Sequence, residues 1–336
     1  MIKEYDLITY GRSSIDLYSA NIGAPFVEIE AFNAYVGGSP LNIAVGASRL
    51  GLKSALLTAV GEDKVGDFVL NFLKREGVET EFIPVKSGAR TSAVVLGIEP
   101  PDNFPLVYYR DNCADSKLTI DDVIKADVGR FRMLEVSATA LNVEPSRSAA
   151  FFAAEEAVKN GVPVLLDIDF RADQWHDPRA FGVMVRAFLH YCTIAIGTEE
   201  EVLAAMLNDP KQIVIKNQQI SAPEITGDIN NSIEKIMKSG LEALIMKRGH
   251  EGVSVHFPDG NKIDVPGFPV KVVNVLGAGD AFAAGFIYGR LQGWDWHKSC
   301  RMGNACGAIL VTKPGCSNFA PTLTETLEFI ESKGGF

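Results

Sequence analysis

The sequence lacks the features that mark membrane, secreted and zinc-binding proteins. No apolar run reaches the roughly 18 residues of a membrane-spanning helix, and the chain starts on a strand pattern rather than on a signal peptide. The five cysteines form no C-x-x-C pair, and the five histidines form no i, i+4 pair suited to a metal. We therefore expect reduced thiols, no disulfide framework and no zinc site, as in a cytoplasmic protein without a membrane partner.

Basic charge is also scarce. The chain has 32 Lys and Arg residues against 42 Asp and Glu residues, which gives a net charge of −10. Nucleic-acid binding requires a basic face, so this balance argues against a nucleic-acid partner. It does not exclude a small anionic ligand, because a few local donors decide such binding.

Two common nucleotide-binding motifs are missing. The interval from Gly46 to Gly51 is that of a Walker P-loop, but Leu52-Lys53-Ser54 follows where Lys and Ser/Thr should come at once. The stretch around Gly277 does not fit the dinucleotide fingerprint, because Phe282 occupies the place of its third glycine. A phosphate-binding function must therefore rest on another kind of loop.

The chain does contain a regular alternation of short β-branched runs and helical patterns. This alternation is typical of a parallel sheet covered by helices on both faces. With 336 residues, 47% of them hydrophobic, we predict one doubly wound α/β domain over residues 1–336. The predicted strands are 6–10, 54–60, 133–136, 162–167, 194–196, 243–247 and 253–256. The predicted helices are 40–50, 63–76, 144–160, 178–190, 198–207, 278–291, 296–311 and 322–331.

Two stretches, residues 12–36 and about 88–112, do not fit this alternation. Both are rich in Val, Ile, Phe and Tyr. In a doubly wound fold both would leave the carboxyl edge of the sheet, where ligands bind. We predict that they form a small β-lid over the active site; the alternative is a pair of long surface loops.

The most informative segment runs from Asn274 to Ile287. Its small residues Gly277-Ala278-Gly279 leave backbone N–H groups bare at a predicted helix N-terminus, where an anion binds. A carboxylate, Asp280, stands in the same first turn. It can face an anion if a hydroxyl lies between them and gives up its proton as a phosphoryl group approaches. This predicts a small-molecule kinase; the alternative is a tight turn followed by an acid that favours the first helical turn.

A glycine pair, Gly37-Gly38, precedes another predicted helix start, with Ser39 as N-cap and Pro40 at its first position. Paired glycines allow a ligand to approach the backbone closely. Asn42, on the exposed first turn, carries an amide that can donate to and accept from sugar hydroxyls. Asp16 follows the first strand; it would accept a hydrogen bond from a sugar hydroxyl if the fold brings it near, and otherwise caps a turn.

Two charged clusters follow predicted buried strands. Asp167, Asp169 and Arg171 alternate, so an extended segment would project them to one side. They form either a simple ion-pair cluster or a site where Arg171 binds a substrate carboxylate or phosphate. Thr198-Glu199-Glu200-Glu201 fits a helix capping box, and its carboxylates can also organise Mg²⁺ through water.

Together these segments resemble the PfkB (ribokinase-like) carbohydrate kinase family over essentially the whole chain. Two signatures carry the resemblance, Gly37-Gly38…Asn42-x-Ala44 and Asn274…Gly277-Ala278-Gly279-Asp280…Gly285. The resemblance implies a ribokinase-like fold, in which helices flank a mainly parallel sheet with a small β-sheet lid. It also implies an ATP- and Mg²⁺-dependent carbohydrate kinase that forms a homo-oligomer, with a dimer expected first.

Within the family, four further segments resemble the branch that acts in myo-inositol catabolism: residues 167–175, 196–201, 247–249 and 266–270. Residues 108–115, which begin Tyr-Tyr-Arg, are similar to a stretch of kinases that accept sugar acids. This implies phosphorylation of a terminal hydroxyl of 5-dehydro-2-deoxy-D-gluconate to give its 6-phosphate. The same motifs fit a 2-keto-3-deoxygluconate kinase or a fructokinase, and a sugar-binding regulator on a kinase scaffold is the non-enzymatic alternative.

The resemblance implies roles for the matching residues. Asp280 would be the catalytic base, and the anion hole would be Gly277, Ala278 and Gly279. The substrate-binding residues would be Asp16, Gly37, Gly38, Asn42, Arg110 and Arg171. The nucleotide would contact Lys247, Gly249, Gly252, Asn304 and Gly307. Glu201 would hold Mg²⁺ through water.

Two positions depart from the family pattern. Thr198 replaces the Asn of the family's Asn-x-x-Glu magnesium motif, which favours the capping-box interpretation of Glu201. Asn274 replaces an Asp that many members have at a monovalent-cation site. The loss of that charge argues against potassium activation.

Overall fold

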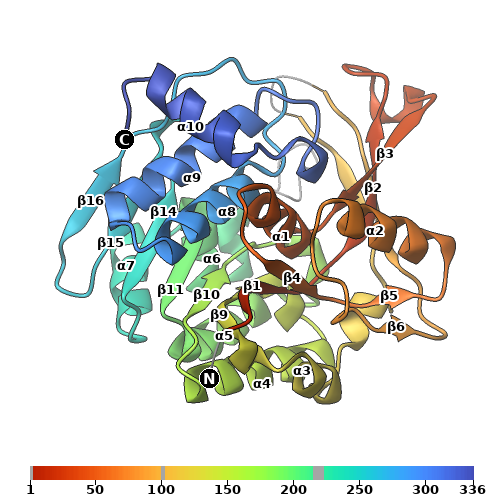
Figure 1. The fold of residues 1–336 in the computed structure, drawn as a ribbon, viewed down its shortest axis with the longest axis horizontal. Helices are drawn as coiled ribbons and strands as arrows, with labels where there is room; N and C mark the ends of the chain where they lie inside the picture. The colour runs from red at the N-terminus through yellow and green to blue at the C-terminus, as the bar shows by residue number, and fades with distance from the viewer. Residues whose placement is uncertain (1–2, 100–102, 215–222) are drawn as a thin grey trace.

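The computed structural model describes residues 3–99, 103–214 and 223–336. Within them, eight strands form a central sheet: β1 (Tyr5–Tyr10), β4 (Ser54–Leu57), β9 (Phe131–Ser137), β10 (Val164–Asp167), β11 (Ile194–Thr198), β14 (Ala243–Lys247), β15 (Val253–His256) and β16 (Lys262–Val265). Their order across the sheet is β16-β15-β14-β11-β10-β9-β1-β4 (Figure 1). The strands from β4 to β14 run parallel, and the last two are antiparallel. The predicted mainly parallel sheet is confirmed.

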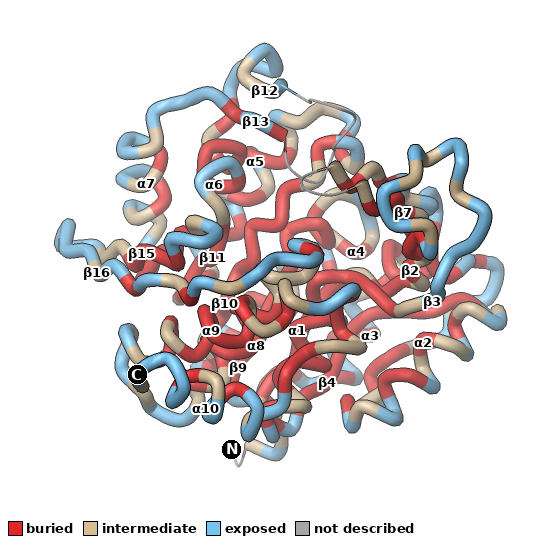
Figure 2. Tube along the Cα trace, turned by 90° about the horizontal axis from the view of Figure 1, so that it is seen from above, coloured by how far each residue is buried: buried red, intermediate tan, exposed pale blue. Residues whose placement is uncertain are grey.

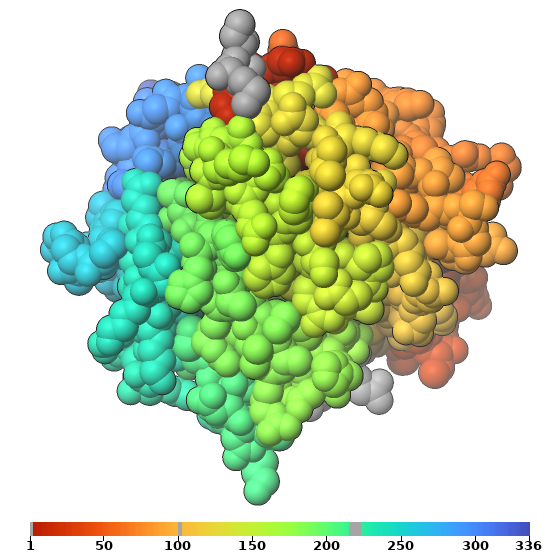
Figure 3. Space-filling view, turned by 90° about the horizontal axis from the view of Figure 1, so that it is seen from below, coloured from red at the N-terminus to blue at the C-terminus, as the bar shows by residue number. Residues whose placement is uncertain are grey.

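Helices cover both faces of the sheet. One face carries α3 (Ile120–Ala126), α4 (Ser146–Lys159), α5 (Pro178–Phe188), α6 (Glu199–Ala205) and α7 (Ile229–Met237). The other carries α1 (Ser39–Arg49), α8 (Ala278–Leu291) and α9 (Trp296–Leu310), with α2 (Lys64–Arg75) and α10 (Leu323–Ser332) packed outside α1 and α9. Figure 3 shows the first face, where segments coloured yellow to green form a nearly continuous layer. The α/β doubly wound class is therefore confirmed.

Strand side chains alternate between two apolar layers, which is why both faces need a cover. In β1, Leu7 packs toward α1 and α8, whereas Ile8 packs toward α3 and α4. Met133 and Leu134 of β9 divide in the same way, and all four side chains are at most 4% exposed. Figure 2 shows these buried strands running through the middle of the molecule.

All eight helices predicted from the sequence are present, and their ends differ from the prediction by two residues or fewer. The periodic pattern did not predict α3 and α7, which are only seven and nine residues long. So few turns give a weak periodic signal, and both helices depend on packing against their neighbours.

The two segments outside the alternation form a second sheet of four strands: β2 (Ser14–Ser19), β3 (Phe32–Gly37), β7 (Ser92–Leu96) and β8 (Leu106–Tyr109). We call it the small sheet; its strand order is β3-β2-β7-β8, and β2 and β3 project at the upper right of Figure 1. Asp16 pairs with Val94, and Val94 pairs with Tyr108. Asp16 and Tyr108 thus lie on the same face of the small sheet. Its role as a lid, and the single-domain organisation, stay predictions.

The remaining strands are short ladders: β5 (Val60–Gly61) with β6 (Val85–Lys86), and β12 (Ile213–Val214) with β13 (Glu224–Ile225). The five cysteines are free and buried. Among the described residues, no helix combines the length and the apolar character needed to cross a bilayer.

Candidate active site

The predicted site residues meet at the carboxyl edge of the central sheet. Asp167 ends β10 and Lys247 ends β14, and their side chains lie 3.4 Å apart. From α1, Asn42 donates a hydrogen bond to Asp280 of α8 (Nδ2 to Oδ2, 2.6 Å). Parallel strands end at one edge of the sheet, so segments far apart in sequence contribute to one site. The roles of these residues in binding and catalysis stay predictions.

Asp280 lies in the first turn of α8. This helix begins directly after Gly277, whose backbone is in the left-handed region (φ +79°). Burial raises the pKa of Asp280 to about 7, and the nearby carboxylate of Asp167 adds to the effect. Hydrogen bonds from Asn42 and Ser39 oppose it because they stabilise the ionised form. A carboxyl group with a pKa near neutrality suits a general base.

Bare backbone amides lie beside Asp280. Among the described residues, no group accepts a hydrogen bond from the N–H of Gly277, Gly279 or Asp280. Ala278 was also predicted to belong to the anion hole, but its N–H already donates to the carbonyl of Val275 (3.3 Å). A Cβ placed on Gly279 would come within 3.0 Å of Lys247 Nζ, so an ammonium stands at the same helix N-terminus. Bare amides, the helix dipole and this ammonium together favour an anion.

Lys247 lies between two carboxylates, 3.4 Å from Asp167 and 3.6 Å from Glu201. Burial alone would lower the pKa of Lys247, but these two carboxylates raise it above its ordinary value, so the ammonium is retained. Burial raises the pKa of Asp167 to about 6, against the opposing effect of Lys247. The cluster therefore keeps one fixed positive charge at the sheet edge.

Glu201 forms the capping box that its sequence predicts. Its Oε2 accepts from the N–H of Thr198 (2.7 Å), while Thr198 Oγ1 accepts from the N–H of Glu201 (3.2 Å). Within the described residues, Oε1 accepts no hydrogen bond, and no three metal-ligating side chains cluster. Mg²⁺ commonly binds through water to one or two carboxylates plus substrate phosphates. The second carboxylate oxygen of Glu201 remains for such a contact, and Mg²⁺ at Glu201 stays a prediction.

The start of α1 differs from its prediction. The N-cap is Gly38 rather than Ser39, because the Ser39 hydroxyl donates to Asp167 Oδ2 (3.0 Å) across the site. Asn42, predicted to be exposed, is only 9% exposed. Its Oδ1 accepts from Ser317 Oγ (2.6 Å), which orients its Nδ2 toward Asp280. The side chains of Ser39 and Asn42 are thus both hydrogen-bonded to residues far away in the sequence.

Gly37 of β3 allows a close approach of backbone and carboxylate. A Cβ at this position would lie 1.9 Å from Asp16 Oδ2, so no other residue fits without moving Asp16. Asp16 is buried and accepts from Ser14 Oγ (2.6 Å). Burial raises its pKa, and the Arg12 guanidinium opposes the shift. The structure thus brings three of the predicted sugar contacts, Asp16, Gly37 and Gly38, into one place.

Replacing Gly37 by Ala should raise the KM for the sugar at least about tenfold, because the new methyl group displaces Asp16 and a hydrogen bond to a charged group is lost. The KM for ATP should stay unchanged. Steady-state kinetics with each substrate varied in turn measures both values, and Asp16→Asn serves as the comparison without a steric clash. An unchanged sugar KM in both variants would remove Asp16 from the sugar site.

The Asp167–Arg171 segment is not extended as predicted, since Asp169 has φ +22°. Arg171 Nη2 lies 2.6 Å from Asp169 Oδ1, and Ser137 Oγ donates to Asp169 Oδ2 (3.0 Å). Burial would raise the pKa of Asp169, but Arg171 and Arg12 hold it below its ordinary value. The structure therefore contains the ion pair of the first interpretation, and a ligand contact of Arg171 stays a prediction.

Arg110 is enclosed by protein groups. Its side chain is 7% exposed and pairs with Asp115 at 2.6 Å. It also donates to the carbonyl oxygen of Thr139 (3.0 Å) and to Gln174 Oε1 (2.7 Å). This conformation leaves Arg110 little capacity for a substrate carboxylate.

The predicted nucleotide residues lie in the second half of α9 and in the turn between β14 and β15. Asn304 Nδ2 donates to the carbonyls of Val265 and Pro266 (3.1 Å each), so it holds the end of β16. Gly307 lies against the start of α8, where a Cβ would be 3.2 Å from the carbonyl oxygen of Ala278. Gly249 and Gly252 bound the turn between β14 and β15.

Asn274 is buried and accepts from the N–H of Leu276 (3.0 Å), which shapes the loop before α8.

Sequence patterns missed a buried acid beneath the site. Glu135 of β9 is 0% exposed, and neither carboxyl oxygen has a hydrogen-bond partner among the described residues. Burial raises its pKa well above the ordinary value, with Asp167 and Asp280 adding to the effect, so the neutral form is favoured. The signal was present, since Glu135 is the one charged residue in the predicted strand 133–136.

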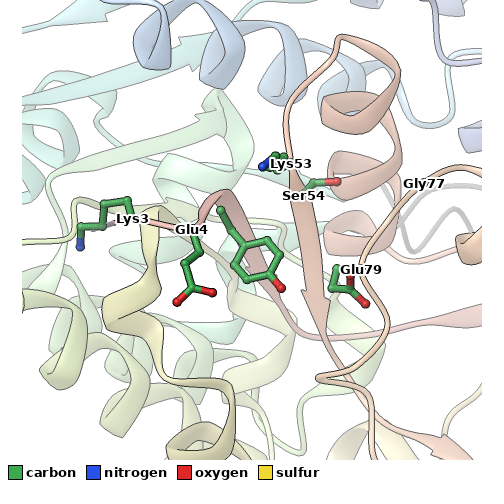
Figure 4. Close-up of a pocket in the computed structure, with 7 residues that line it drawn as sticks. Lys3, Glu4, Lys53, Ser54, Gly77 and Glu79 are labelled. Atoms are coloured by element: carbon green, nitrogen blue, oxygen red, sulfur yellow. The ribbon is translucent and has the colours of Figure 1, made fainter. Parts of the chain in front are cut away.

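A surface hollow lies at the opposite edge of the sheet (Figure 4). Tyr5 and Ser54, which line it, begin β1 and β4. The other lining residues are Lys3, Glu4, Lys53, Gly77 and Glu79. None of the predicted site residues is among them, so the hollow is separate from the candidate active site.

Comparison with known proteins agrees with the two signatures. A family model described as pfkB family carbohydrate kinase matches residues 5–323. The chain belongs to the pfkB carbohydrate kinase family. The match covers both the Gly37-Gly38 and the Asp280 segments, and it supports an ATP-dependent carbohydrate kinase over nearly the whole chain.

Two curated relatives carry the same enzyme name. The 5-dehydro-2-deoxygluconokinase of Geobacillus thermodenitrificans is 33% identical over 330 residues, which is 98% of this chain and 94% of the relative. The 5-dehydro-2-deoxygluconokinase of Clostridium perfringens is 32% identical over 332 residues, with the same coverage.

Solved structures of sugar kinases share the fold. A sugar kinase from Pyrococcus horikoshii in complex with ATP aligns with TM-score 0.79 and 25% identity, over 97% of this chain and 99% of that one. A fructokinase with bound ATP from Xylella fastidiosa aligns with TM-score 0.83 and 23% identity, over 99% of both chains. The second comparison speaks for the fold alone.

Proposed function

We propose that this pfkB-family chain phosphorylates a sugar acid, 5-dehydro-2-deoxy-D-gluconate, at its terminal hydroxyl to give the 6-phosphate, with ATP and Mg²⁺. Two lines support this substrate. Relatives at 33% identity over 98% of the chain carry the name of that kinase. The segments from Asp167 to Trp175 and from Ile196 to Glu201 also resemble the same branch.

One observation carries the phosphotransfer itself: the Asp280 carboxylate and two bare amides stand together at the start of α8. Asp280 is oriented by Asn42 (2.6 Å), and the amides of Gly279 and Asp280 have no partner in the described part of the chain. An incoming hydroxyl would lie between the carboxylate and a phosphoryl group held by the amides and Lys247.

In the proposed step the sugar hydroxyl oxygen forms a bond to the γ-phosphorus of ATP, the bond to the β-phosphate oxygen breaks, and ADP leaves. Asp280 takes the hydroxyl proton. Because the transition state is loose, the proton leaves late, and the position of the carboxylate counts for more than its basicity. The bare amides and Lys247 stabilise charge on the transferred group.

The nucleotide would lie along Lys247, Gly249 and Gly252 toward Asn304 and Gly307, with Mg²⁺ near Glu201. Since Asn274 has no charge to offer a monovalent cation, we propose that activity does not depend on potassium.

We also propose that the small sheet covers the sugar and that the chain forms a dimer. We place the protein in the cytoplasm, where its five buried thiols stay reduced.

A substrate panel tests the choice of sugar. The kcat/KM for 5-dehydro-2-deoxy-D-gluconate should exceed that for D-fructose by about 10² or more, because a charge-assisted hydrogen bond to the acid has no counterpart in a neutral sugar. A coupled assay for ADP, with 2-keto-3-deoxy-D-gluconate as a second acid, measures each value. Equal values for the acid and fructose would contradict a sugar-acid kinase, and a complete lack of turnover would favour a sugar-binding regulator.

A further inference from the structure

Arg12 lies in the short link between β1 of the central sheet and β2 of the small sheet. This link runs beside the predicted sugar glycines. Ser14 pairs with Gly37, and a Cβ on Gly38 would come within 2.3 Å of the Arg12 carbonyl oxygen. Arg12 therefore stands next to the sugar position.

The guanidinium of Arg12 uses few of its hydrogen-bond donors. Nη1 donates to Ser14 Oγ (2.7 Å), and Ser14 Oγ in turn donates to Asp16 Oδ1 (2.6 Å). The ring of Tyr108 lies over the guanidinium, with its centroid 5.2 Å from Cζ. Arginine has five N–H donors in a planar fork. In the described part of the chain Nε and Nη2 make no hydrogen bond, and neither is sealed from solvent.

Arg12 differs in this respect from the other two arginines of the site. Arg171 contacts Asp169 and Arg110 contacts Asp115, each at 2.6 Å. Among the described residues, no carboxylate is in ion-pair contact with Arg12, although Asp16, Asp115 and Asp169 are near enough to attract it. Burial would lower the pKa of Arg12, but Tyr108 and these three carboxylates raise it above its ordinary value, so the guanidinium stays charged with no anion in contact. Its unused donors are therefore available to the carboxylate of a ligand.

We infer that Arg12 binds the carboxylate of the sugar acid through its Nε–Nη2 edge, beneath Tyr108, and so determines the preference for acids over neutral sugars. The inference rests on the proposed function. Ser14 holds the opposite corner of the guanidinium and fixes the plane of the fork. A planar fork matches the two oxygens of a carboxylate, which a single ammonium does not. Tyr108 and Asp16 lie on the same face of the small sheet. The contacts to the substrate carboxylate and to the sugar hydroxyl would therefore lie on one side of the sugar.

The test compares Arg12→Gln and Arg12→Lys with the natural protein, using 5-dehydro-2-deoxy-D-gluconate, D-fructose and ATP as varied substrates. Arg12→Gln should lower kcat/KM for the acid by about 10–10²-fold through KM, since a charge-assisted pair is lost. The kcat, the KM for ATP and the kcat/KM for fructose should stay within about threefold. Arg179→Gln is the matched control, because Arg179 is half exposed and, among the residues that the structure describes, forms an ion pair with Asp177 alone.

The outcomes separate this inference from the proposed function. If the natural protein prefers the acid but Arg12→Gln loses equally on acid and fructose, or loses nothing, the inference is overturned and the sugar-acid kinase stands. If the natural protein shows no preference for the acid, both fall. Should Arg12→Gln not fold, Arg12→Lys decides: a loss of about tenfold on the acid alone supports the two-bond contact, and an unchanged preference overturns it.

Discussion

Replacing Asp280 by Asn is expected to lower kcat by about 10²–10⁴-fold while the affinity for ATP is kept. The amide retains the shape of the carboxylate and its contact with Asn42, but it cannot take the hydroxyl proton. The bare amides of Gly279 and Asp280 and the ammonium of Lys247 remain to bind phosphate. Single-turnover kinetics gives the rate of transfer, and calorimetry with ATP gives the affinity. Turnover near that of the natural protein would refute the role of Asp280.

The stability of Asp280→Asn tests whether its lost activity comes from unfolding. The folded-state pKa of Asp280, about 7, lies above the ordinary value of 3.8. A carboxyl group with a raised pKa contributes stability below its unfolded pKa and loses that contribution as pH rises through its folded pKa. At pH 8 the natural protein therefore carries a costly, partly buried charge that Asp280→Asn lacks. The variant should unfold at an equal or higher temperature at pH 8, so its lost activity is not lost folding.

Asp67→Asn is the matched control for that comparison. Asp67 lies on α2 with a side chain that is 66% exposed, in an i, i+3 pair with Lys64. The same chemical change there should leave kcat, ATP affinity and melting temperature nearly unchanged, because exposed pairs contribute little.

Activity should fall steeply on the acid side of neutrality. Asp280 must be ionised to accept a proton, so kcat/KM should drop about tenfold per pH unit below its pKa, to roughly 1% of its plateau two units lower. The pKa concerned is about 7. Asp167, with a pKa raised to about 6, protonates in the same range and should steepen the lower part of the curve. A pH–rate profile from pH 5 to 9 measures this limb.

The nucleotide titrates in the same region, since a terminal phosphate has a pKa near 6, and the profile of Asp280→Asn separates the two effects. The residual activity of that variant should keep the phosphate titration and lose the steeper limb. An acid limb centred near pH 4 in the natural protein would contradict the burial of Asp280.

Local patterns were sufficient to predict most elements and the two signature loops. The segment Ala278–Leu291 is helical in both prediction and structure, because small residues, an acidic first turn and apolar spacing all favour the same element. Patterns failed where a distant partner decides. Ser39 has the residue type of an N-cap, yet its hydroxyl bonds to Asp167 from another strand. Arg110 was predicted to bind substrate, and only the fold shows its pairing with Asp115. For Arg171 the sequence left an ion pair and a ligand contact open, and the fold supplies the pair with Asp169.

The sequence by itself determined the α/β class, the family, and the helix start that carries Asp280, because each depends on residues within a turn or a short repeat. Only the tertiary structure decided the charges. Asp280 has its raised pKa because the fold places it, partly buried, in the site near Asp167, and the pKa of Glu135 is raised because the fold buries it beneath the same carboxylates. Arg12 differs from its neighbours through its contacts with Ser14 and Tyr108 of the small sheet, which only the fold brings together. The physical reason is that electrostatic energy depends on distance and burial in space, and neither follows from separation along the chain.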